Sequence, residues 1–324
     1  MLTTLSEIES AAELIRPIVP PTPQYCWPLL CERLGTETWV KHENHTPGGA
    51  FKIRGGLVYF AELARSGGLP SGVITATRGN HGLSVAYAAR RYDVAATVVV
   101  PHGNSKEKNA AMRALGVELI EYGEDFQAAR ERAEALARER SLHMVPSFHP
   151  LLVAGVATCS LELLRAVSGI DVVYVPIGLG SGICGMLAVR DALGLKTQVV
   201  GVVSAQAPAY ARSFLARRPI ECPVTTAIAD GMACRRPEPV ALEEIYRGVE
   251  RIVEVTDEEI ASAMRTLFEC THNVSEGAGA AALAAARKEQ ANLVGRRVAI
   301  VLSGGNIDRD LFASVLGTAP SAYG

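Results

Sequence analysis

The sequence predicts an α/β protein with mostly parallel sheets flanked by helices. From residue 72 onward, short runs rich in β-branched residues alternate with alanine-rich segments of helical length. The runs are GVITA, AATVVV, VELIEY, DVVYVPI, TQVVGVV and RRVAIVL. Strands separated by helices in this way pair in parallel, with helices covering both faces of the sheet. A chain of 324 residues that is 48% hydrophobic is long enough for one large or two moderate cores.

The expected helices lie between these strands, and two of them have recognisable ends. Helical composition marks AYAARRY, SKEKNAAMRALG, FQAARERAEALARER and LVAGVATCSLELLRAV. Ser105 can cap the second of these helices, and Gly116 can end it. Thr256 and Glu259 form a capping box ahead of a later helix. The stretch 222–250, which contains three prolines, is the longest irregular piece, and no path is assigned to it.

Composition argues against several classes of protein. The formal net charge is −2 and no basic run interleaves with aromatic residues, so no nucleic-acid partner is expected. The seven cysteines are never spaced as CxxC, so neither a disulfide framework nor a zinc site is expected. The charge-free stretch 172–189 contains Pro176 and four glycines, which favour a strand, a turn and a helix start over a membrane span.

The N-terminal segment bears on localisation. It carries acidic residues where an export signal would carry basic ones. Ser6 and Glu9 within it fit a capping box on an ordinary helix. The protein is therefore expected to be cytoplasmic, with no membrane partner.

A glycine-rich turn follows the run DVVYVPI. Within IGLGSGICG, Gly180, Gly182 and Gly185 fit the pattern GxGxxG. Glycines let backbone N–H groups converge on a phosphate, and the helix that follows adds its partial positive charge. A dinucleotide site is disfavoured, because the next strand runs into Ser204 rather than an acidic residue that would hold a ribose. The turn is predicted to bind phosphate, with a plain tight turn as the alternative.

Two further polar turns are expected at strand ends, where α/β folds bind ligands. The turn TRGNHG follows GVITA and supplies the polar side chains of Thr77, Arg78, Asn80 and His81. The turn SGGN follows RRVAIVL and leaves the Ser303 hydroxyl available. For the first turn the alternative is that its Asn-His pair simply caps the helix. The second turn taken alone is a weak signal.

One lysine is distinguished by its neighbours. The segment HTPGGAFKIRGG places Lys52 between Phe51 and Ile53, with glycines on both sides. A desolvated lysine can lose its proton and attack a carbonyl group, whereas arginine stays charged. The alternative is a lysine that extends to solvent from a helix start. The other five lysines are expected at the solvated surface: Lys41, Lys106, Lys108, Lys196 and Lys288.

The phosphate turn, the apolar-flanked lysine and the neutral polar turns together match what pyridoxal phosphate requires. A lysine holds the aldehyde of this cofactor, a glycine loop holds its phosphate, and other groups tune the ring as an electron sink. The glycines around Lys52 are interpreted as room for the ring. A non-catalytic ligand-binding protein and a nicotinamide oxidoreductase remain as alternatives from other classes.

The same residues resemble the fold type II pyridoxal-phosphate enzymes, specifically the threonine/serine dehydratase and serine racemase group. The resemblance runs from PTP at 21–23 to SGGN at 303–306, and the family motif Ser-Phe-Lys-x-Arg-Gly is AFKIRG here. It implies that Lys52 binds the cofactor as a Schiff base and moves the α-proton. It also implies cofactor contacts at Phe51, Asn80, Gly178, Leu179, Gly180, Ser181, Gly182 and Ser303. Substrate contacts are implied at Thr77, Arg78, Gly79 and His81.

The resemblance also implies a domain organisation. A large cofactor-binding domain would comprise residues 1–71 and 150–324, and a small inserted domain would comprise residues 72–149. Each domain would hold a mostly parallel sheet flanked by helices. The chain ends at residue 324 without a C-terminal regulatory domain, which we expect to distinguish it from the feedback-inhibited biosynthetic threonine enzymes.

Three positions bear on how far the resemblance extends. Glu276, in SEGAGA, matches a glutamate of the family. Arg78 stands where the racemases of this group carry a serine that acts on the second face of the substrate, which disfavours a racemase. Val203 stands where some members carry an acidic metal ligand, so no metal is expected.

The function that the resemblance implies is a dehydratase, or ammonia-lyase. It would convert a β-hydroxy-α-amino acid of the threonine, serine or 3-phenylserine type into a 2-oxo acid and ammonia. A phenylserine dehydratase and a hydroxyectoine-utilisation dehydratase are the members it resembles. A 3-hydroxyaspartate dehydratase, an amino-acid racemase and a β-replacement synthase on the same fold remain as alternatives. The partner is a small amino acid, and the assembly to test is a homodimer.

Overall fold

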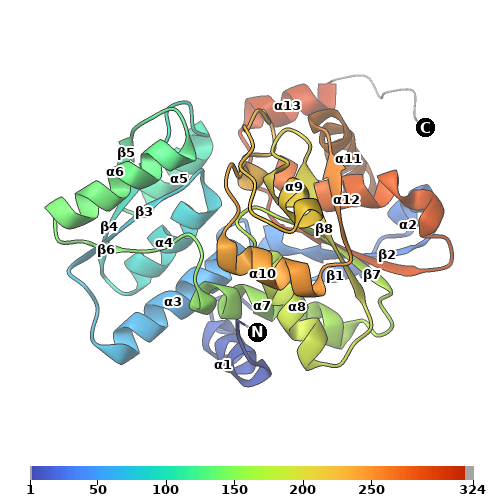
Figure 1. The fold of residues 1–324 in the computed structure, drawn as a ribbon, viewed down its shortest axis with the longest axis horizontal. Helices are drawn as coiled ribbons and strands as arrows, with labels where there is room; N and C mark the ends of the chain where they lie inside the picture. The colour runs from blue at the N-terminus through green and yellow to red at the C-terminus, as the bar shows by residue number, and fades with distance from the viewer. Residues whose placement is uncertain (1, 318–324) are drawn as a thin grey trace.

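The computed structural model describes residues 2–317, which form two sheets flanked by helices (Figure 1). One sheet has six strands in the order β1-β2-β10-β7-β8-β9, and the other has four in the order β5-β4-β3-β6. Within the described chain every strand pair is parallel except β1 with β2. The predicted α/β class with two mostly parallel sheets is confirmed.

The six-stranded sheet takes its strands from both ends of the chain. They are β1 (Gln24–Cys26), β2 (Glu37–His42), β7 (Val172–Pro176), β8 (Gln198–Ser204), β9 (Arg251–Val255) and β10 (Arg297–Leu302). The helices of this half are α1 (Leu5–Ile15), α2 (Pro28–Leu34), α7 (Pro150–Ala166), α8 (Ser181–Ala192), α9 (Ala209–Ala216), α10 (Pro239–Gly248), α11 (Asp257–Thr271), α12 (Gly277–Lys288) and α13 (Arg309–Gly317). The small side chains of α12 let it pack closely against β7, β8, β9 and β10.

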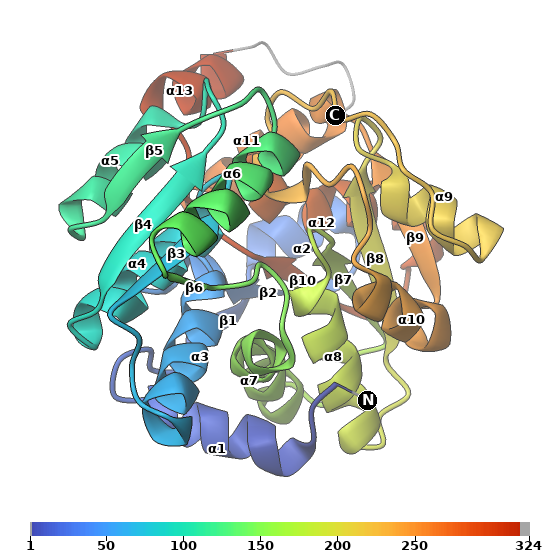
Figure 2. The same ribbon diagram turned by 60° about the vertical axis from the view of Figure 1, so that its left-hand side comes forward.

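The four-stranded sheet comes from the middle of the chain. Its strands are β3 (Gly72–Ala76), β4 (Ala95–Val100), β5 (Glu118–Glu121) and β6 (His143–Met144), with helices α3 (Lys52–Ser66), α4 (Asn80–Arg91), α5 (Lys106–Ala114) and α6 (Phe126–Glu139). Consecutive residues of β3 point to opposite faces of the sheet and enter different hydrophobic cores. Val73 packs with α3 and α4, and Ile74 packs with α6. Figure 2 shows α6 lying across the face of β3 and β4. The predicted division at residues 71 and 149 stays a prediction.

The helix ends follow the capping signals in two of three cases. Ser105 caps α5, and Thr256 with Glu259 forms the capping box of α11, as predicted. The capping box of α1 is formed instead by Thr4 and Glu7, so the predicted box at Ser6 and Glu9 is wrong. The charge-free stretch 172–189 divides into β7, a turn and the start of α8, and no helix within residues 2–317 is long and apolar enough to cross a membrane.

The glycines after Lys52 serve helix packing, which corrects their interpretation as room for a cofactor. A Cβ atom on Gly55 would lie 2.8 Å from the carbonyl oxygen of Leu152 in α7. A Cβ atom on Gly56 would lie 2.8 Å from the carbonyl oxygen of Ser84 in α4. Both distances are too short for any other residue, so these glycines let α3 approach two neighbouring helices closely.

Lys41 is buried, although the sequence predicted it at the surface. Its Nζ donates to Glu162 at 2.6 Å and to the carbonyl oxygen of Thr22 at 2.8 Å. The fully buried Arg54 donates to Glu43 at 2.7 Å and to the same Glu162 at 2.6 Å. A buried charge is tolerated only when it is paired and hydrogen-bonded. This network anchors the first turn of α3, which begins at Lys52.

Candidate active site

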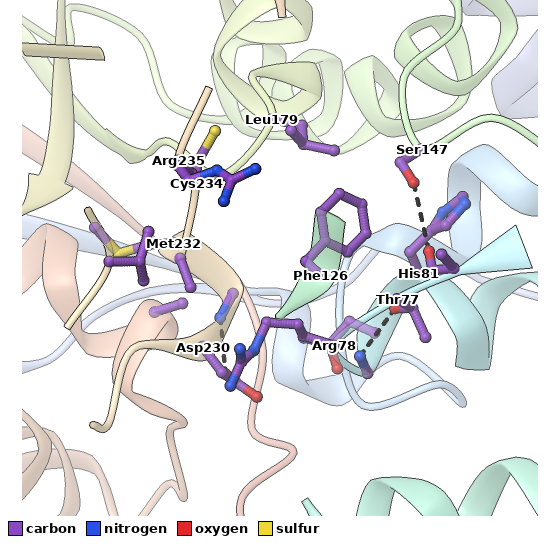
Figure 3. A pocket seen from close by; sticks show the side chains of 18 of the residues that line it. Thr77, Arg78, His81, Phe126, Ser147, Leu179, Asp230, Met232, Cys234 and Arg235 are labelled. Carbon is purple, nitrogen blue, oxygen red and sulfur yellow. Dashed lines mark hydrogen bonds between the residues drawn. The ribbon is translucent and has the colours of Figure 1, made fainter. Parts of the chain in front are cut away.

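A cavity of about 840 Å³ opens at the carboxyl ends of β3 and β7 (Figure 3). One side is formed by residues of the four-stranded half, and the other by residues of the six-stranded half. Every site residue that the sequence predicted lies in its wall: Phe51, Lys52, Thr77, Arg78, Gly79, Asn80, His81, Gly178, Leu179, Gly180, Ser181, Gly182 and Ser303. The three polar turns and the lysine, far apart in the sequence, are therefore brought together.

Lys52 extends into this cavity. Its Nζ donates to the Ser181 hydroxyl at 3.2 Å and lies 5.2 Å from the centre of the Phe51 ring. Burial lowers the pKa of Lys52 from its usual 10.5 to about 8. Ser84 of α4 donates to the Lys52 carbonyl oxygen at 2.6 Å, which fixes the backbone at the start of α3. The amine is thus partly desolvated and close to its ionisation point at physiological pH.

The loop between β7 and α8 presents backbone to the cavity. Gly180 has a φ of +98°, a left-handed conformation that favours glycine. A Cβ atom on Gly178 would lie 2.4 Å from the carbonyl oxygen of Gly231, and one on Gly180 would lie 2.6 Å from Cβ of Ala241. Tyr210 holds the loop by donating to the Leu179 carbonyl oxygen at 2.9 Å. The first N–H groups of α8 have no intrahelical acceptor, which makes this loop suited to an anion.

The turn after β3 is shaped by Thr77. Its hydroxyl accepts hydrogen bonds from the N–H groups of Gly79 at 2.9 Å and Gly82 at 3.1 Å. Burial, with a smaller contribution from the Lys52 charge, lowers the pKa of His81 to about 3, so its ring is neutral. The Nε2 atom of His81 is buried and has no hydrogen-bond partner among the described residues. A neutral, unsatisfied ring therefore faces this region of the cavity.

A buried polar cluster behind this turn was not predicted. Lys108, also expected at the surface, is 4% exposed and donates to Glu276 at 2.8 Å and to Asp230 at 2.7 Å. Glu276 accepts a hydrogen bond from the Asn80 amide at 2.6 Å, and Asn306 donates to the Asn80 oxygen at 2.9 Å. Asn80 is thereby held on both sides of its amide group.

The rim of the cavity comes from the stretch to which the sequence assigned no path. Residues 223–224 and 230–239 line the opening, including the short helix η2 (Asp230–Met232). Arg235 of this rim pairs with Asp125, the N-cap of α6, at 3.1 Å. This exposed pair joins the two halves across the opening, as do Lys108 and Asp230 deeper inside.

Comparison with known proteins gives the family. The chain matches the family described as pyridoxal-phosphate dependent enzyme over residues 15–304. It belongs to that family. An L-threonine ammonia-lyase from Thermotoga maritima is 32% identical to it over 316 residues, which are 97% of this chain and 78% of the relative. An L-threo-3-hydroxyaspartate ammonia-lyase from Saccharomyces cerevisiae is 29% identical over 320 residues, which are 98% of this chain and 97% of the relative.

A solved structure agrees with this membership. Maize serine racemase matches with a TM-score of 0.90 at 26% identity, covering 97% of each chain. The resemblance to fold type II enzymes, the two-sheet fold and pyridoxal phosphate as cofactor are confirmed. The wall of this pyridoxal-phosphate dependent enzyme's cavity fits the cofactor, because it joins a desolvated lysine to a glycine cradle at a helix N-terminus.

Proposed function

We propose that the protein is a pyridoxal-phosphate dependent dehydratase. It converts a β-hydroxy-α-amino acid of the threonine, serine or 3-phenylserine type into a 2-oxo acid and ammonia. The observation that carries this proposal is the position of the Lys52 amine, 3.2 Å from Ser181 at the start of α8, in one cavity with the polar turn after β3. The similarity to two relatives named as ammonia-lyases supports the reaction class.

Lys52 is the catalytic residue of this proposal. When bound, pyridoxal phosphate supplies an electron sink for the bond that breaks at the α-carbon of the amino acid. Lys52 would hold the cofactor through its aldehyde, and the free amine of Lys52 would accept the α-proton of the amino acid at Nζ. A pKa of about 8 suits this exchange, because both the neutral and the charged amine are accessible near neutral pH.

Two helix N-termini hold the anionic groups in this proposal. The backbone N–H groups of Gly178, Leu179, Gly180, Ser181 and Gly182 would bind the cofactor phosphate, and Phe51, Asn80 and Ser303 would contact its ring. The start of α4, with Thr77, Gly79 and His81, binds the substrate α-carboxylate. His81 contributes hydrogen bonding without charge, since its pKa is about 3.

The proposal also covers the partner, the assembly and the compartment of the enzyme. The partner is a small amino acid, the assembly is a homodimer, and the enzyme acts in the cytoplasm.

An amino-acid racemase is the nearest rival on the same fold. It is disfavoured by Arg78, which lines the cavity where racemases of the group carry a serine. Chiral analysis of serine recovered after incubation distinguishes the two activities, because a dehydratase leaves no D-serine.

Substitution of Lys52 tests the proposal. Purified wild-type protein is expected to show the visible absorbance of a lysine-bound cofactor and to release 2-oxo acid from at least one of serine, threonine, 3-phenylserine and 3-hydroxyaspartate. Lys52→Ala is expected to lose that absorbance and to slow 2-oxo acid release by roughly a thousandfold or more. The control is Lys196→Ala, at an exposed lysine. Equal rates for wild type and Lys52→Ala would falsify the proposal.

A further inference from the structure

Arg78 is an arginine of the cavity wall whose charge has no partner. It follows Thr77 at the end of β3 and is half-buried. Its Nε atom is buried without a hydrogen-bond partner, and within residues 2–317 no acidic side chain pairs with its guanidinium. A partly desolvated guanidinium that lacks an anion is unfavourable, so this arrangement indicates a site for an anion that enters from outside the chain.

The other arginines of the cavity wall differ from Arg78 in this respect. Each pairs with a carboxylate: Arg130 with Glu134 at 2.9 Å, Arg235 with Asp125 at 3.1 Å, and Arg236 with Glu221 at 3.4 Å. Their charges are already compensated by the protein. Among the cavity arginines of the described chain, Arg78 alone is left to meet a ligand.

Asp230 also lines the cavity, but its carboxylate is committed elsewhere (Figure 3). One carboxylate oxygen of Asp230 accepts from Lys108 at 2.7 Å, and the other accepts from the N–H of Gly231 at 2.8 Å. The carboxylate therefore serves the buried lysine and its own turn.

Two anions of the proposed reaction already have places in the structure. The cofactor phosphate fits the loop at the start of α8, where glycines leave the backbone accessible. The α-carboxylate fits the start of α4, whose first N–H groups have no intrahelical acceptor. Arg78 lies beside that second place, one residue before Gly79, so a further anion on the same substrate is within reach of its side chain.

We propose that Arg78 binds a second carboxylate, carried on the substrate side chain. It thereby makes the enzyme select β-hydroxy-α-amino dicarboxylic acids over threonine and serine. This inference rests on the proposed dehydratase function. A guanidinium suits the task, because its planar fork can form two parallel hydrogen bonds to one carboxylate. Arg78 is then a specificity-determining residue of the site.

Kinetic specificity is the first test. The ratio of kcat/KM for L-threo-3-hydroxyaspartate to kcat/KM for L-threonine is measured in wild type, Arg78→Gln, Arg78→Lys and Arg130→Gln. Wild type is expected to prefer the dicarboxylic acid. Arg78→Gln is expected to lower the ratio about 10- to 100-fold, mostly through KM for 3-hydroxyaspartate, and Arg78→Lys to lower it less. Arg130→Gln, at an arginine that is already paired, is expected to change the ratio less than about twofold.

Binding of unreactive amino acids is the second test. L-Aspartate and L-alanine have no β-hydroxyl group to eliminate, so their dissociation constants can be measured by calorimetry on the holoenzyme. Arg78→Gln is expected to weaken L-aspartate about 10- to 100-fold and L-alanine less than about threefold. Equal weakening of both ligands overturns the inference, because Arg78 would then bind the α-carboxylate. No weakening of L-aspartate overturns it as well.

The two proposals fail in different ways. If no amino acid yields a 2-oxo acid but Arg78→Gln still weakens L-aspartate selectively, the dehydratase proposal fails and the carboxylate site stands. If 2-oxo acid forms with the same substrate ratio in wild type and Arg78→Gln, the reaction stands and the role of Arg78 is refuted.

Discussion

Lys52 shows how burial at a single residue changes the chemistry of a side chain. Its amine is surrounded by the wall of the cavity and donates one hydrogen bond, to Ser181. With a pKa of about 8, roughly a tenth of such amines are neutral at pH 7, against roughly one in 3,000 at the usual pKa of 10.5. Only the neutral amine attacks an aldehyde, so the site raises the reactive fraction by about two orders of magnitude.

A pH series tests this effect in cofactor-free protein. Competitive reductive methylation with formaldehyde, read by peptide mass spectrometry, gives the labelling rate of each lysine at each pH. The rate at Lys52 is expected to rise with pH and to level off above about pH 8, because below its pKa the amine is protonated and unreactive. Exposed Lys196 is the internal reference. A midpoint for Lys52 that coincides with that of Lys196 contradicts the desolvation argument.

Single residues also show why part of the site was predictable. Apart from Phe51 and Lys52, each predicted site residue directly follows a hydrophobic run, so glycine and polar residues there indicate a ligand without knowledge of the fold. Lys108 gave no such signal, because it lies in the polar segment KEKNAAMRALG and pairs with residues more than a hundred positions away. Its one signal is its place four residues before the fully buried Met112, on the same face of α5.

At the scale of elements, the loop between β7 and α8 is specified by its backbone. Gly180 combines a positive φ of +98° with close contact to Ala241, and Gly194 has a positive φ of +63° in open space. Gly180→Ala is expected to lower pyridoxal phosphate affinity by about tenfold or more, since strain and collision both displace the start of α8.

Gly194→Ala is the matched control for that prediction. It is expected to destabilise the fold by only about 1 kcal/mol, measured by urea unfolding, and to leave cofactor affinity unchanged. Cofactor titration of both variants decides the matter. If the two variants lose affinity equally, the effect comes from general strain and not from the loop between β7 and α8.

Elements were predictable where their signal was local. The runs GVITA and AATVVV coincide with β3 and β4, because strands buried on both faces are continuously apolar. The strand β2 was not foreseen, since ETWVKH includes a charged lysine whose half-buried partner Glu162 lies in α7. For α1 the sequence contains two overlapping capping signals. Burial of Ile8 and Ile15 accompanies the one that begins at Thr4.

At the scale of the whole molecule, the buried Lys108 joins the two sheets beside the active site. It belongs to α5 of the four-stranded half, and its partners Asp230 and Glu276 belong to the six-stranded half. Burial alone would lower the pKa of Lys108, but the two carboxylates outweigh burial and raise it, so the ammonium stays charged. Glu276 also accepts a hydrogen bond from Asn80 in the cavity wall. The same carboxylate therefore joins the two halves and positions a side chain of the cavity.

Removing that charge is expected to loosen the junction. Lys108→Met leaves the buried Glu276 and the half-buried Asp230 without their cation. Breaking a buried ion pair costs about 3–5 kcal/mol. If residues 72–149 form the proposed small domain, this cost should appear as earlier, separate unfolding of that segment. Hydrogen exchange of α5 and η2 is expected to quicken in the variant. Lys106→Met, at an exposed lysine on the same helix, should behave as wild type. A single cooperative transition with unchanged exchange would refute both the junction and the domain division.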